Sequence, residues 1–510
     1  MKKILLLFIV CISFITTSRA QHADRTKFIK DSLDLYISRA LTNWRVPGIA
    51  VCIVKDNKIV LIKGYGIKEL GLPNPVDVNT LFMIGSNTKA FTATALAMLQ
   101  ANNKLSLDEK VTKYIPEFKL DNKFAGQEAT VRDLLCHRLG FQTFQGDFTF
   151  YNTNLTRADV IKKLGELKAT YPFRTKWGYT NAAFLTAGEL IPRVAGKPWE
   201  VYIKEAIFAP LGMTNTLALS KDLPKSLNRT VPHTFTNDGR LTPIPYCQID
   251  GLAPAGAISS SASDMSKWVL ALLNNGKVGN RQVIPQTAIM ATREPQDIVG
   301  SQFHLNGENN FELYGLGWFI QDYFNHRLIM HDGGVNGYLS SVTLSPQDNL
   351  GIVILTNTDQ NRIYEALRWE ILDAYFGRGY RNYSDAYLKN YKTQASAEQQ
   401  TDRKLRDTLL LNLKPALPIS AYTGKYSNSF YGSMTVTQGE NNDLEMRFEH
   451  HPIMFAKLQP LGGNRFYVTF SDLALGKAVF PFTVQNGRVT SVKVKVADFI
   501  ERGAYEFKKD

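Results

Sequence analysis

The sequence predicts an α+β fold followed by a small antiparallel β-barrel, and two observations indicate this. Strand-like runs lie at 48–55 and 58–65 and recur between 315 and 356, with helices and loops between them. Such an order favours one antiparallel sheet that is completed by its two ends and flanked by helices. From Leu417 onward, apolar and polar residues alternate in runs separated by turn signals such as residues 439–442 and Asn486-Gly487. This period of two is typical of a small barrel or sandwich.

The individual elements follow from hydrophobic periodicity and turn signals. Asp56 and Asn57 separate the first two strand-like runs and indicate a hairpin. The stretch after Lys89 carries no charge until Lys104 and has apolar residues at helical spacing, so we expect a helix buried on nearly all sides. The other expected elements are helices at 26–43, 131–137 and 362–376, a helix opened by a capping box at 261–264, and strands at 315–320, 327–331, 338–344 and 351–356.

Composition divides the chain into segments. Residues 1–20 have the pattern of an export signal: Lys2 and Lys3, an apolar run from 4 to 15, and the small-x-small sequence at 18–20. That run is too short to span a membrane, so we expect an exported protein, periplasmic or secreted, with no membrane span. A hydrolase-sized domain is expected at 21–377, a polar linker with some helix at 378–415, and the β-barrel domain at 416–510.

Charge and single residues exclude some functions. The chain has 59 basic and 46 acidic side chains but no basic run interleaved with aromatic residues, so nucleic acid is not an expected partner. The excess of positive charge fits anionic cell-wall polymers or simply solubility. The cysteines lack metal-ligand spacing, and His450 and His451 are expected at the surface rather than on a metal. No metal and no cofactor is inferred.

The motif with the clearest chemistry is Ser86-x-x-Lys89, at the start of the expected buried helix. Residues three apart share a helix face, so the two side chains should meet. A desolvated lysine has a lowered pKa and can act as a base toward a neighbouring hydroxyl. The alternative is that Ser86 only caps the helix while Lys89 reaches solvent.

Two later motifs favour the catalytic interpretation. Tyr179-x-Asn181 offers a phenol for proton transfer and an amide that can both donate and accept. His331 is followed by Asp332, Gly333 and Gly334 at the start of an expected strand pair. Glycines at such a strand edge let a substrate approach and present backbone N–H groups to an oxyanion.

Together, these motifs resemble the serine β-lactamase and penicillin-binding-protein superfamily. The closer resemblance is to its class C-like branch of D-aminopeptidases, D,D-carboxypeptidases and esterases. The resemblance covers about residues 30–377 and includes 47–51, 131–137 and 314–318. It implies an antiparallel sheet with an all-helical subdomain. Residues 417–510 resemble the lipocalin-like β domains that follow some of these hydrolases.

The resemblance also implies roles for the motif residues. Ser86 would be the acylated nucleophile, with Lys89 and Tyr179 as proton-shuttling base and acid. Asn181, His331 and Gly333 would line the substrate site, and the N–H groups of Ser86 and Gly334 would form the oxyanion hole. His331 stands where β-lactamases have a lysine, which removes the fixed cation that would hold a β-lactam carboxylate.

The sequence therefore predicts an exported serine hydrolase that cleaves a small peptide, amide or ester through an acyl-enzyme. Its expected partner is a small molecule or short peptide, with cell-wall fragments as one source. The alternatives are a β-lactamase and a non-catalytic penicillin-binding or cell-wall sensor protein. The intact Ser86, Lys89 and Tyr179 favour the enzyme, because a pure binding protein has no need of them.

Overall fold

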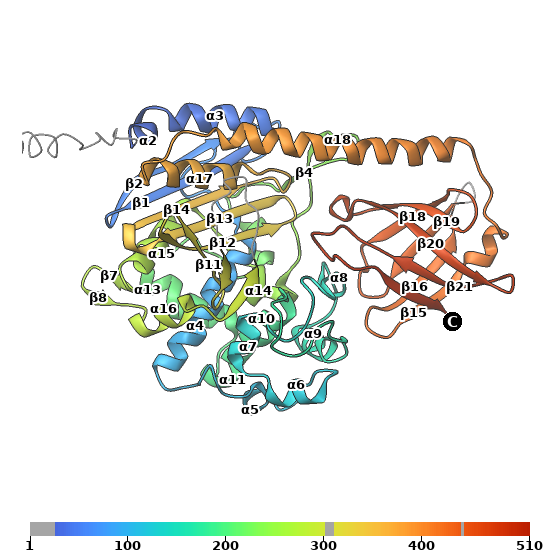
Figure 1. The fold of residues 1–510 in the computed structure, drawn as a ribbon, viewed down its shortest axis with the longest axis horizontal. Helices are drawn as coiled ribbons and strands as arrows, with labels where there is room; N and C mark the ends of the chain where they lie inside the picture. Colours follow the sequence, from blue (N-terminus) through green and yellow to red (C-terminus); the bar gives the residue numbers. More distant parts are fainter. Residues whose placement is uncertain (1–25, 301–310, 440–442) are drawn as a thin grey trace, which may run out of the picture.

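The computed structural model describes residues 26–300, 311–439 and 443–510. The predicted export signal and positions 440–442 of a predicted turn lie outside these residues. Figure 1 shows a large body of sheet and helices, a smaller β-barrel beside it, and the long helix α18 running past both. The α+β fold and the C-terminal barrel that the sequence predicts are confirmed. Across the described ranges, no helix is both long and apolar enough to cross a membrane.

The large body is built on an eight-stranded antiparallel sheet. Strands from the beginning and the end of this body's sequence pair with each other in it. Its order is β2-β1-β14-β13-β12-β11-β10-β9. β1 pairs with β14 with Cys52 opposite Val353, as a sheet completed by both ends requires. The strands are β1 (Gly48–Lys55), β2 (Lys58–Gly66), β9 (Asp297–Gly300), β10 (Glu312–Tyr314), β11 (Phe319–Tyr323), β12 (His326–Val335), β13 (Tyr338–Ser345) and β14 (Leu350–Thr356).

The predicted strand at 315–320 is wrong. β10 ends at Tyr314 and β11 begins at Phe319, so residues 315–318 form the turn between them. Gly317 has a φ of +74°, and a Cβ there would lie 2.8 Å from the carbonyl oxygen of Lys89. The turn therefore packs tightly on the backbone of the helix that follows Ser86, which the apolar pattern of these residues does not reveal.

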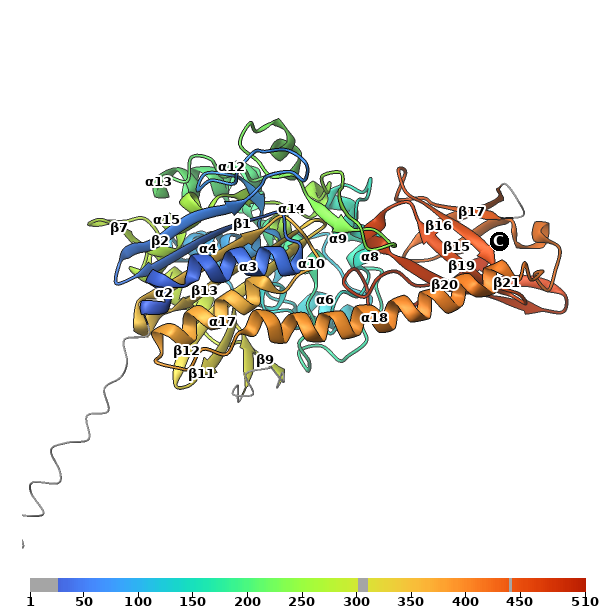
Figure 2. The ribbon, with the colours of Figure 1, turned by 90° about the horizontal axis from the view of Figure 1, so that it is seen from above.

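Helices cover both faces of the sheet. Alternate residues of β1 enter two different cores: Val51 and Ile53 pack with α2 (Lys27–Asp31), α3 (Leu33–Trp44) and α17 (Ile363–Tyr375). Ala50, Cys52 and Val54 face the other core, which contains α4 (Thr88–Ala101) and α15 (Ala262–Leu273). Both layers are visible in Figures 1 and 2. A strand buried on both faces reads as a continuous apolar run, as residues 49–54 do.

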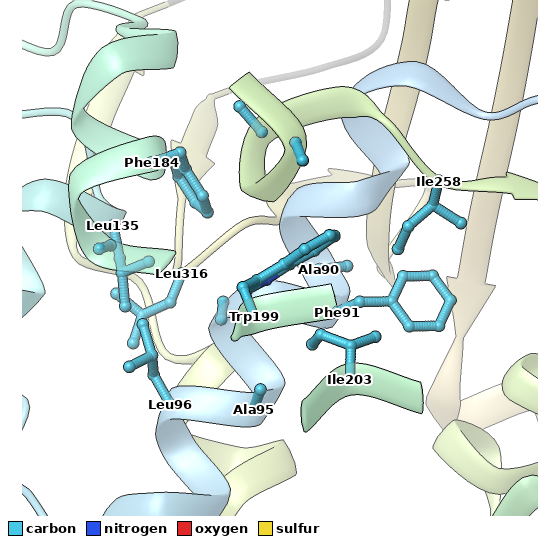
Figure 3. Packing of buried hydrophobic residues seen from close by; sticks show 14 of the residues in the cluster. Ala90, Phe91, Ala95, Leu96, Leu135, Phe184, Trp199, Ile203, Ile258 and Leu316 are labelled. Carbon is cyan, nitrogen blue, oxygen red and sulfur yellow. The ribbon is translucent and has the colours of Figure 1, made fainter. Parts of the chain in front are cut away.

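The helix that follows Ser86 is the centre of the second core. Every residue of α4 from Thr88 to Leu99 is buried, as the sequence predicts. Phe91 stacks on Trp268 with ring centroids 4.1 Å apart, and Figure 3 shows Trp199 and Ile203 packed beside it. Such dense packing fixes the N-terminus of α4, and with it the position of Ser86.

Shorter helices make up the rest of this body. They are α5 (Val111–Tyr114), α6 (Lys123–Glu128), α7 (Val131–Leu135), α8 (Asp147–Phe150), α9 (Arg157–Leu164), α10 (Asn181–Gly188), α11 (Leu190–Ala195), α12 (Trp199–Ile203), α13 (Ala209–Leu211), α14 (Ala253–Gly256) and α16 (Gln286–Arg293). Two-stranded pairs are β3 (Phe82–Met83) with β6 (Ser259–Ser260), β4 (His233–Phe235) with β5 (Leu241–Pro243), and β7 (Lys277–Val278) with β8 (Arg281–Gln282).

The polar segment after the hydrolase-like region contains α18 (Tyr383–Leu410), a helix of 28 residues. Its first turns pack on the large body, where the Tyr387 hydroxyl donates to Glu365 at 3.0 Å. Farther along, the carboxylate of Asp402 accepts from Tyr467 and Lys477 of the barrel, both at 2.6 Å. One rigid element thus contacts both bodies, as Figure 2 shows.

The C-terminal region is a closed eight-stranded barrel. Asn486 and Gly487, with φ of +50° and +73°, form the hairpin turn that the sequence predicts between two of its strands. The strands are β15 (Gly424–Asn428), β16 (Gly432–Gln438), β17 (Leu444–Phe448), β18 (Phe455–Pro460), β19 (Arg465–Phe470), β20 (Lys477–Gln485), β21 (Arg488–Val494) and β22 (Tyr505–Lys509).

Candidate active site

Ser86 lies on a short 3-10 turn, Gly85–Asn87, that leads directly into α4. It is the one residue between Leu81 and Ala90 that is not buried. Lys89 Nζ lies 3.1 Å from Ser86 Oγ, as expected for residues one helical turn apart. The alternative in which Lys89 extends to solvent is wrong, because its side chain is fully buried.

The ammonium group of Lys89 has three polar neighbours. Besides Ser86, these are Asn181 Oδ1 at 2.7 Å and the Ala255 carbonyl oxygen at 2.9 Å. Burial lowers the pKa of Lys89 to about 7, and the charge of Asp147 opposes this decrease. A neutral amine can donate to Asn181 and Ala255 while its lone pair accepts the Ser86 hydroxyl proton. The geometry is therefore that of a base placed against a nucleophile.

Tyr179 lies just ahead of α10, with its ring 4.6 Å from Lys89 Nζ. Burial raises the pKa of this phenol, and contact with Ser86 opposes the increase. Its hydroxyl is buried and has no hydrogen bond of ordinary geometry within the described residues. The phenol therefore stays protonated near neutral pH, as a proton donor beside Ser86.

Asn181 is the first residue of α10, and both ends of its amide are engaged. Its Oδ1 accepts from Lys89 at 2.7 Å, while Nδ2 donates to Asp147 Oδ2 at 2.6 Å. The sequence predicts that Asn181 binds the substrate amide. In this structure a substrate would have to share the amide with Lys89 and Asp147.

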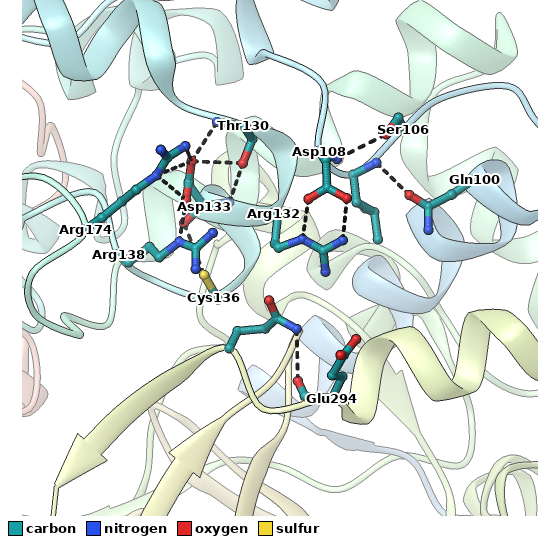
Figure 4. A network of polar contacts seen from close by, with 12 residues as sticks. Gln100, Ser106, Asp108, Thr130, Arg132, Asp133, Cys136, Arg138, Arg174 and Glu294 are labelled. Atoms are coloured by element: carbon teal, nitrogen blue, oxygen red, sulfur yellow. Dashed lines mark hydrogen bonds and ion pairs between the residues drawn. The ribbon is translucent and has the colours of Figure 1, made fainter.

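Asp133 fixes the segment that leads into the tyrosine motif. Its buried carboxylate binds Arg138 and Arg174, with Arg174 Nη2 at 2.6 Å, and it also caps α7 through Thr130 (Figure 4). His137, which precedes Arg138 in the chain, accepts from the Thr180 N–H at 3.1 Å and packs its ring 4.4 Å from that of Tyr179. His137 thus holds Tyr179 and Thr180 in place through these two contacts.

The third motif lies on β12. His331 is buried, and its Nε2 lies 3.2 Å from the hydroxyl of Tyr314. Burial, together with the charge of Lys89, lowers the pKa of His331 to about 4. The imidazole is therefore neutral near pH 7. Protonated His331 does not replace the positive charge that a lysine would provide at this position.

The two glycines after His331 press against the segment that carries the nucleophile. A Cβ on Gly333 would lie 1.9 Å from the Ile84 carbonyl oxygen, and one on Gly85 would lie 2.8 Å from the Gly334 nitrogen. Only residues without side chains allow this approach. It brings the backbone of Gly334 beside that of Ser86, the pair predicted to form an oxyanion hole.

A cleft of about 1910 Å³ opens over these residues. It is lined by the large body, by α18 and by the barrel. The lining includes Ser86, Tyr179, Asn181, His331, Gly333 and Gly334 from the predicted site, and Ala497, Phe499 and Arg502 from the C-terminal region. The barrel therefore borders the cleft in which the predicted site lies.

The sequence did not predict a role for Asp147 or the contact between its segment and the barrel. Asp147 belongs to no motif, and its neighbours Lys89 and Asn181 are far from it in sequence. His451 was expected at the surface but is buried, with its ring stacked 4.5 Å from that of Phe148. Each contact arises from tertiary packing between segments far apart in the sequence, and no motif marks residues 146–148.

Comparison with known proteins identifies the class of the large body. Residues 33–376 match the family model described as Beta-lactamase, and residues 411–508 match a domain of unknown function, DUF3471. The chain is 27% identical over 432 residues to the protein named "Unguisins hydrolase ungD'" of Aspergillus campestris, covering 80% of this chain and 78% of that one.

Two solved structures share the fold. The octameric penicillin-binding protein homologue from Pyrococcus abyssi has a TM-score of 0.58 at 21% identity, covering 94% of this chain and 99% of that chain. The D-stereospecific amidohydrolase from a Streptomyces species has a TM-score of 0.52 at 20% identity, covering 64% and 94%. The chain therefore belongs to the beta-lactamase family and is a serine hydrolase, as the resemblance of its motifs predicts.

Proposed function

We propose that this enzyme hydrolyses a small peptide, amide or ester through an acyl-enzyme on Ser86. The observation that carries the proposal is the buried Lys89, whose amine lies 3.1 Å from Ser86 Oγ and whose pKa is lowered to about 7. A lysine with that pKa is substantially neutral at physiological pH and can accept the hydroxyl proton.

The reaction follows from these positions. Ser86 Oγ attacks the substrate carbonyl carbon as its proton passes to Lys89 Nζ. The tetrahedral oxyanion accepts hydrogen bonds from the N–H groups of Ser86 and Gly334. When the intermediate collapses, the leaving amine or alcohol takes a proton from the Tyr179 phenol, which Lys89 then replenishes. Water hydrolyses the resulting ester by the same steps in reverse, releasing the acid and free Ser86.

The substrate is proposed to be a neutral or weakly charged acyl compound rather than a β-lactam. His331 is neutral near pH 7, so position 331 offers no fixed cation for a β-lactam carboxylate. The similarity to a protein named as a hydrolase of unguisins supports a hydrolytic reaction. The signal-like residues 1–20 support export to the periplasm or beyond, where cell-wall fragments are one source of such compounds.

The test is hydrolysis of a p-nitrophenyl ester by the protein and by its Ser86→Ala variant, with intact-mass detection of the acyl adduct. We expect turnover and an adduct that both disappear with Ser86. Turnover retained in the variant would overturn the mechanism. An adduct that forms with a fluorescent penicillin but is never released would favour the penicillin-binding alternative.

A further inference from the structure

A carboxylate outside the three motifs is connected to the proposed base. Asp147, at the start of α8, is buried and accepts from Asn181 Nδ2 at 2.6 Å. Asn181 in turn accepts from Lys89 at 2.7 Å. The three side chains form a continuous chain of hydrogen bonds that ends at Ser86. The second oxygen of Asp147, Oδ1, is buried and meets no hydrogen-bond donor in the described parts of the chain.

This arrangement decides which way the Asn181 amide points. An amide can turn over and exchange its oxygen and nitrogen ends. Above its pKa of about 7, Asp147 is ionised and its carboxylate only accepts. It then requires the NH₂ end of the amide, and the oxygen is left to face Lys89. Turned the other way, Asn181 would present its NH₂ group to the Lys89 amine, and two donors would oppose each other.

The barrel holds Asp147 in place through the residues on either side of it. The Glu501 carboxylate accepts from the Gly146 N–H at 2.7 Å and from the Phe148 N–H at 3.1 Å. The hydroxyl of Tyr431, also from the C-terminal region, donates to the same carboxylate. These bonds fix the backbone before and after Asp147, which limits the directions its side chain can take.

Packing reinforces the same contact. The Phe148 ring lies 4.5 Å from that of His451 and 5.3 Å from that of Phe448, both in the barrel region. Gly146 has a φ of +83°, and a Cβ there would lie 2.8 Å from the Phe430 ring. Figures 1 and 2 show α8 at the face of the large body that meets the barrel.

We propose that Asp147 is a positioning residue of the Ser86 site, holding the Asn181 amide toward Lys89, and that the C-terminal barrel sets its position through Glu501. This inference rests on the proposed function, since Lys89 is the base it serves. It makes the barrel part of the active site rather than an appended domain.

The charge of Asp147 predicts the direction in which its removal should shift the pKa of Lys89. The titratable groups that face Asp147 are Lys89 from α4, Tyr179 ahead of α10, and Glu501 and Tyr431 from the barrel region. Burial raises the pKa of Asp147, the hydrogen bond from Asn181 lowers it, the charge of Glu501 raises it and the charge of Lys89 lowers it, with a net value of about 7. Conversely, the charge of Asp147 raises the pKa of Lys89.

The first test is the pH dependence of kcat/KM in Asp147→Asn. This variant keeps the size of the side chain and an acceptor for Asn181 but removes the charge. The pKa of Lys89 should fall, so the rising limb of the profile should move to lower pH by about 0.5–1 unit. A merely structural role would lower the rate without moving the limb, and a profile that superposes on that of the wild type would overturn the role of Asp147.

The second test is hydrogen–deuterium exchange in Glu501→Gln. The introduced amide has one acceptor oxygen, and its NH₂ group faces the other backbone N–H, so one of the two bonds is lost. We expect faster exchange at residues 146–148 and a fall in kcat/KM of about tenfold. The control is Asp443→Asn, a buried barrel carboxylate whose partners are Lys457 and Gln459.

Unchanged exchange at 146–148 in Glu501→Gln, or equally faster exchange there in Asp443→Asn, would overturn the role of the barrel. The exchange measurement does not depend on activity. If the wild-type protein shows no Ser86-dependent acylation, the proposed function and the role of Asp147 both fall, while exchange still decides whether Glu501 holds the segment.

Discussion

At the scale of single residues, the proposed mechanism makes the reactivity of Ser86 depend on the protonation state of Lys89. Burial lowers its pKa to about 7, so the neutral base predominates only above that pH. We expect kcat/KM for an activated ester to rise with pH and level off above about 8. The measurement is a pH–rate profile from about pH 5 to 9. His331, with a pKa of about 4, stays neutral over that range. A profile that is flat, or that falls between pH 6 and 8, would contradict Lys89 as the base.

Replacement of Tyr179 should affect catalysis and stability differently. Its hydroxyl is buried without a regular hydrogen bond, so removing it leaves no partner unsatisfied. Tyr179→Phe should therefore keep or slightly increase the thermal stability. The same variant should lose about 10²-fold in kcat, because the proton donor for the leaving group is gone. Steady-state kinetics and a melting curve on the same preparation check both. A variant that is inactive only because it melts earlier would argue against the role.

The residues that the sequence could predict are those whose chemistry is local. Ser86 and Lys89 lie one helical turn apart, so their contact follows from spacing alone. Tyr179 and Asn181 are recognisable as a short motif, although only the fold shows that Asn181 is shared with Asp147. The link between Glu501 and the 146–148 backbone joins distant parts of the chain. No periodicity or motif records such a contact.

At the scale of elements, patterns predicted the strands of period two and the hairpin turn at Asn486 and Gly487, but not the turn at 315–318. Residues 315–318 are apolar enough to resemble a strand, yet Gly317 needs a positive φ to pack on α4. The segment at 378–415 is polar, and its helix is buried only near its start, where Tyr383, Tyr387 and Leu388 face the large body. Such a weak apolar stripe does not distinguish a solvated helix from a linker.

A buried carboxylate determines how the tyrosine motif is placed. Asp133 caps α7 and binds Arg138 and Arg174, and its side chain is completely buried. Asp133→Asn should cost about 3–5 kcal/mol in the free energy of unfolding, because two arginines lose their partner. The control is Asp108→Asn, an exposed carboxylate paired with Arg132, which should cost about 0–1 kcal/mol. Chemical denaturation measures both, and equal losses would contradict this role of Asp133.

At the scale of the whole molecule, several contacts hold the hydrolase body and the barrel together, and one of them is the bond from Lys163 of α9 to the Phe430 carbonyl at 2.9 Å. α18 contacts both, and the segment from 144 to 154 inserts Phe148 against the barrel while Tyr151 donates to Asp472 at 2.9 Å. The cleft lies between these contacts. An enzyme built in this way selects substrates with surfaces from both bodies, so its specificity should depend on how firmly they are joined.

A substitution at Gly146 tests how firmly the two bodies are joined. At φ +83°, an alanine there would be strained, and its Cβ would lie 2.8 Å from the Phe430 ring and 3.0 Å from Leu167. Overpacking should destabilise the contact between the two bodies by about 1–3 kcal/mol. We therefore expect one calorimetric transition for the wild-type protein and two for Gly146→Ala. Gly487→Ala is the control: its φ of +73° imposes similar strain, but apart from its two chain neighbours no described residue has an atom within 4 Å of its Cβ. That variant should lower the stability of the barrel without dividing the transition. A single transition in Gly146→Ala, at the temperature found for Gly487→Ala, would show that the two bodies are not coupled through this segment.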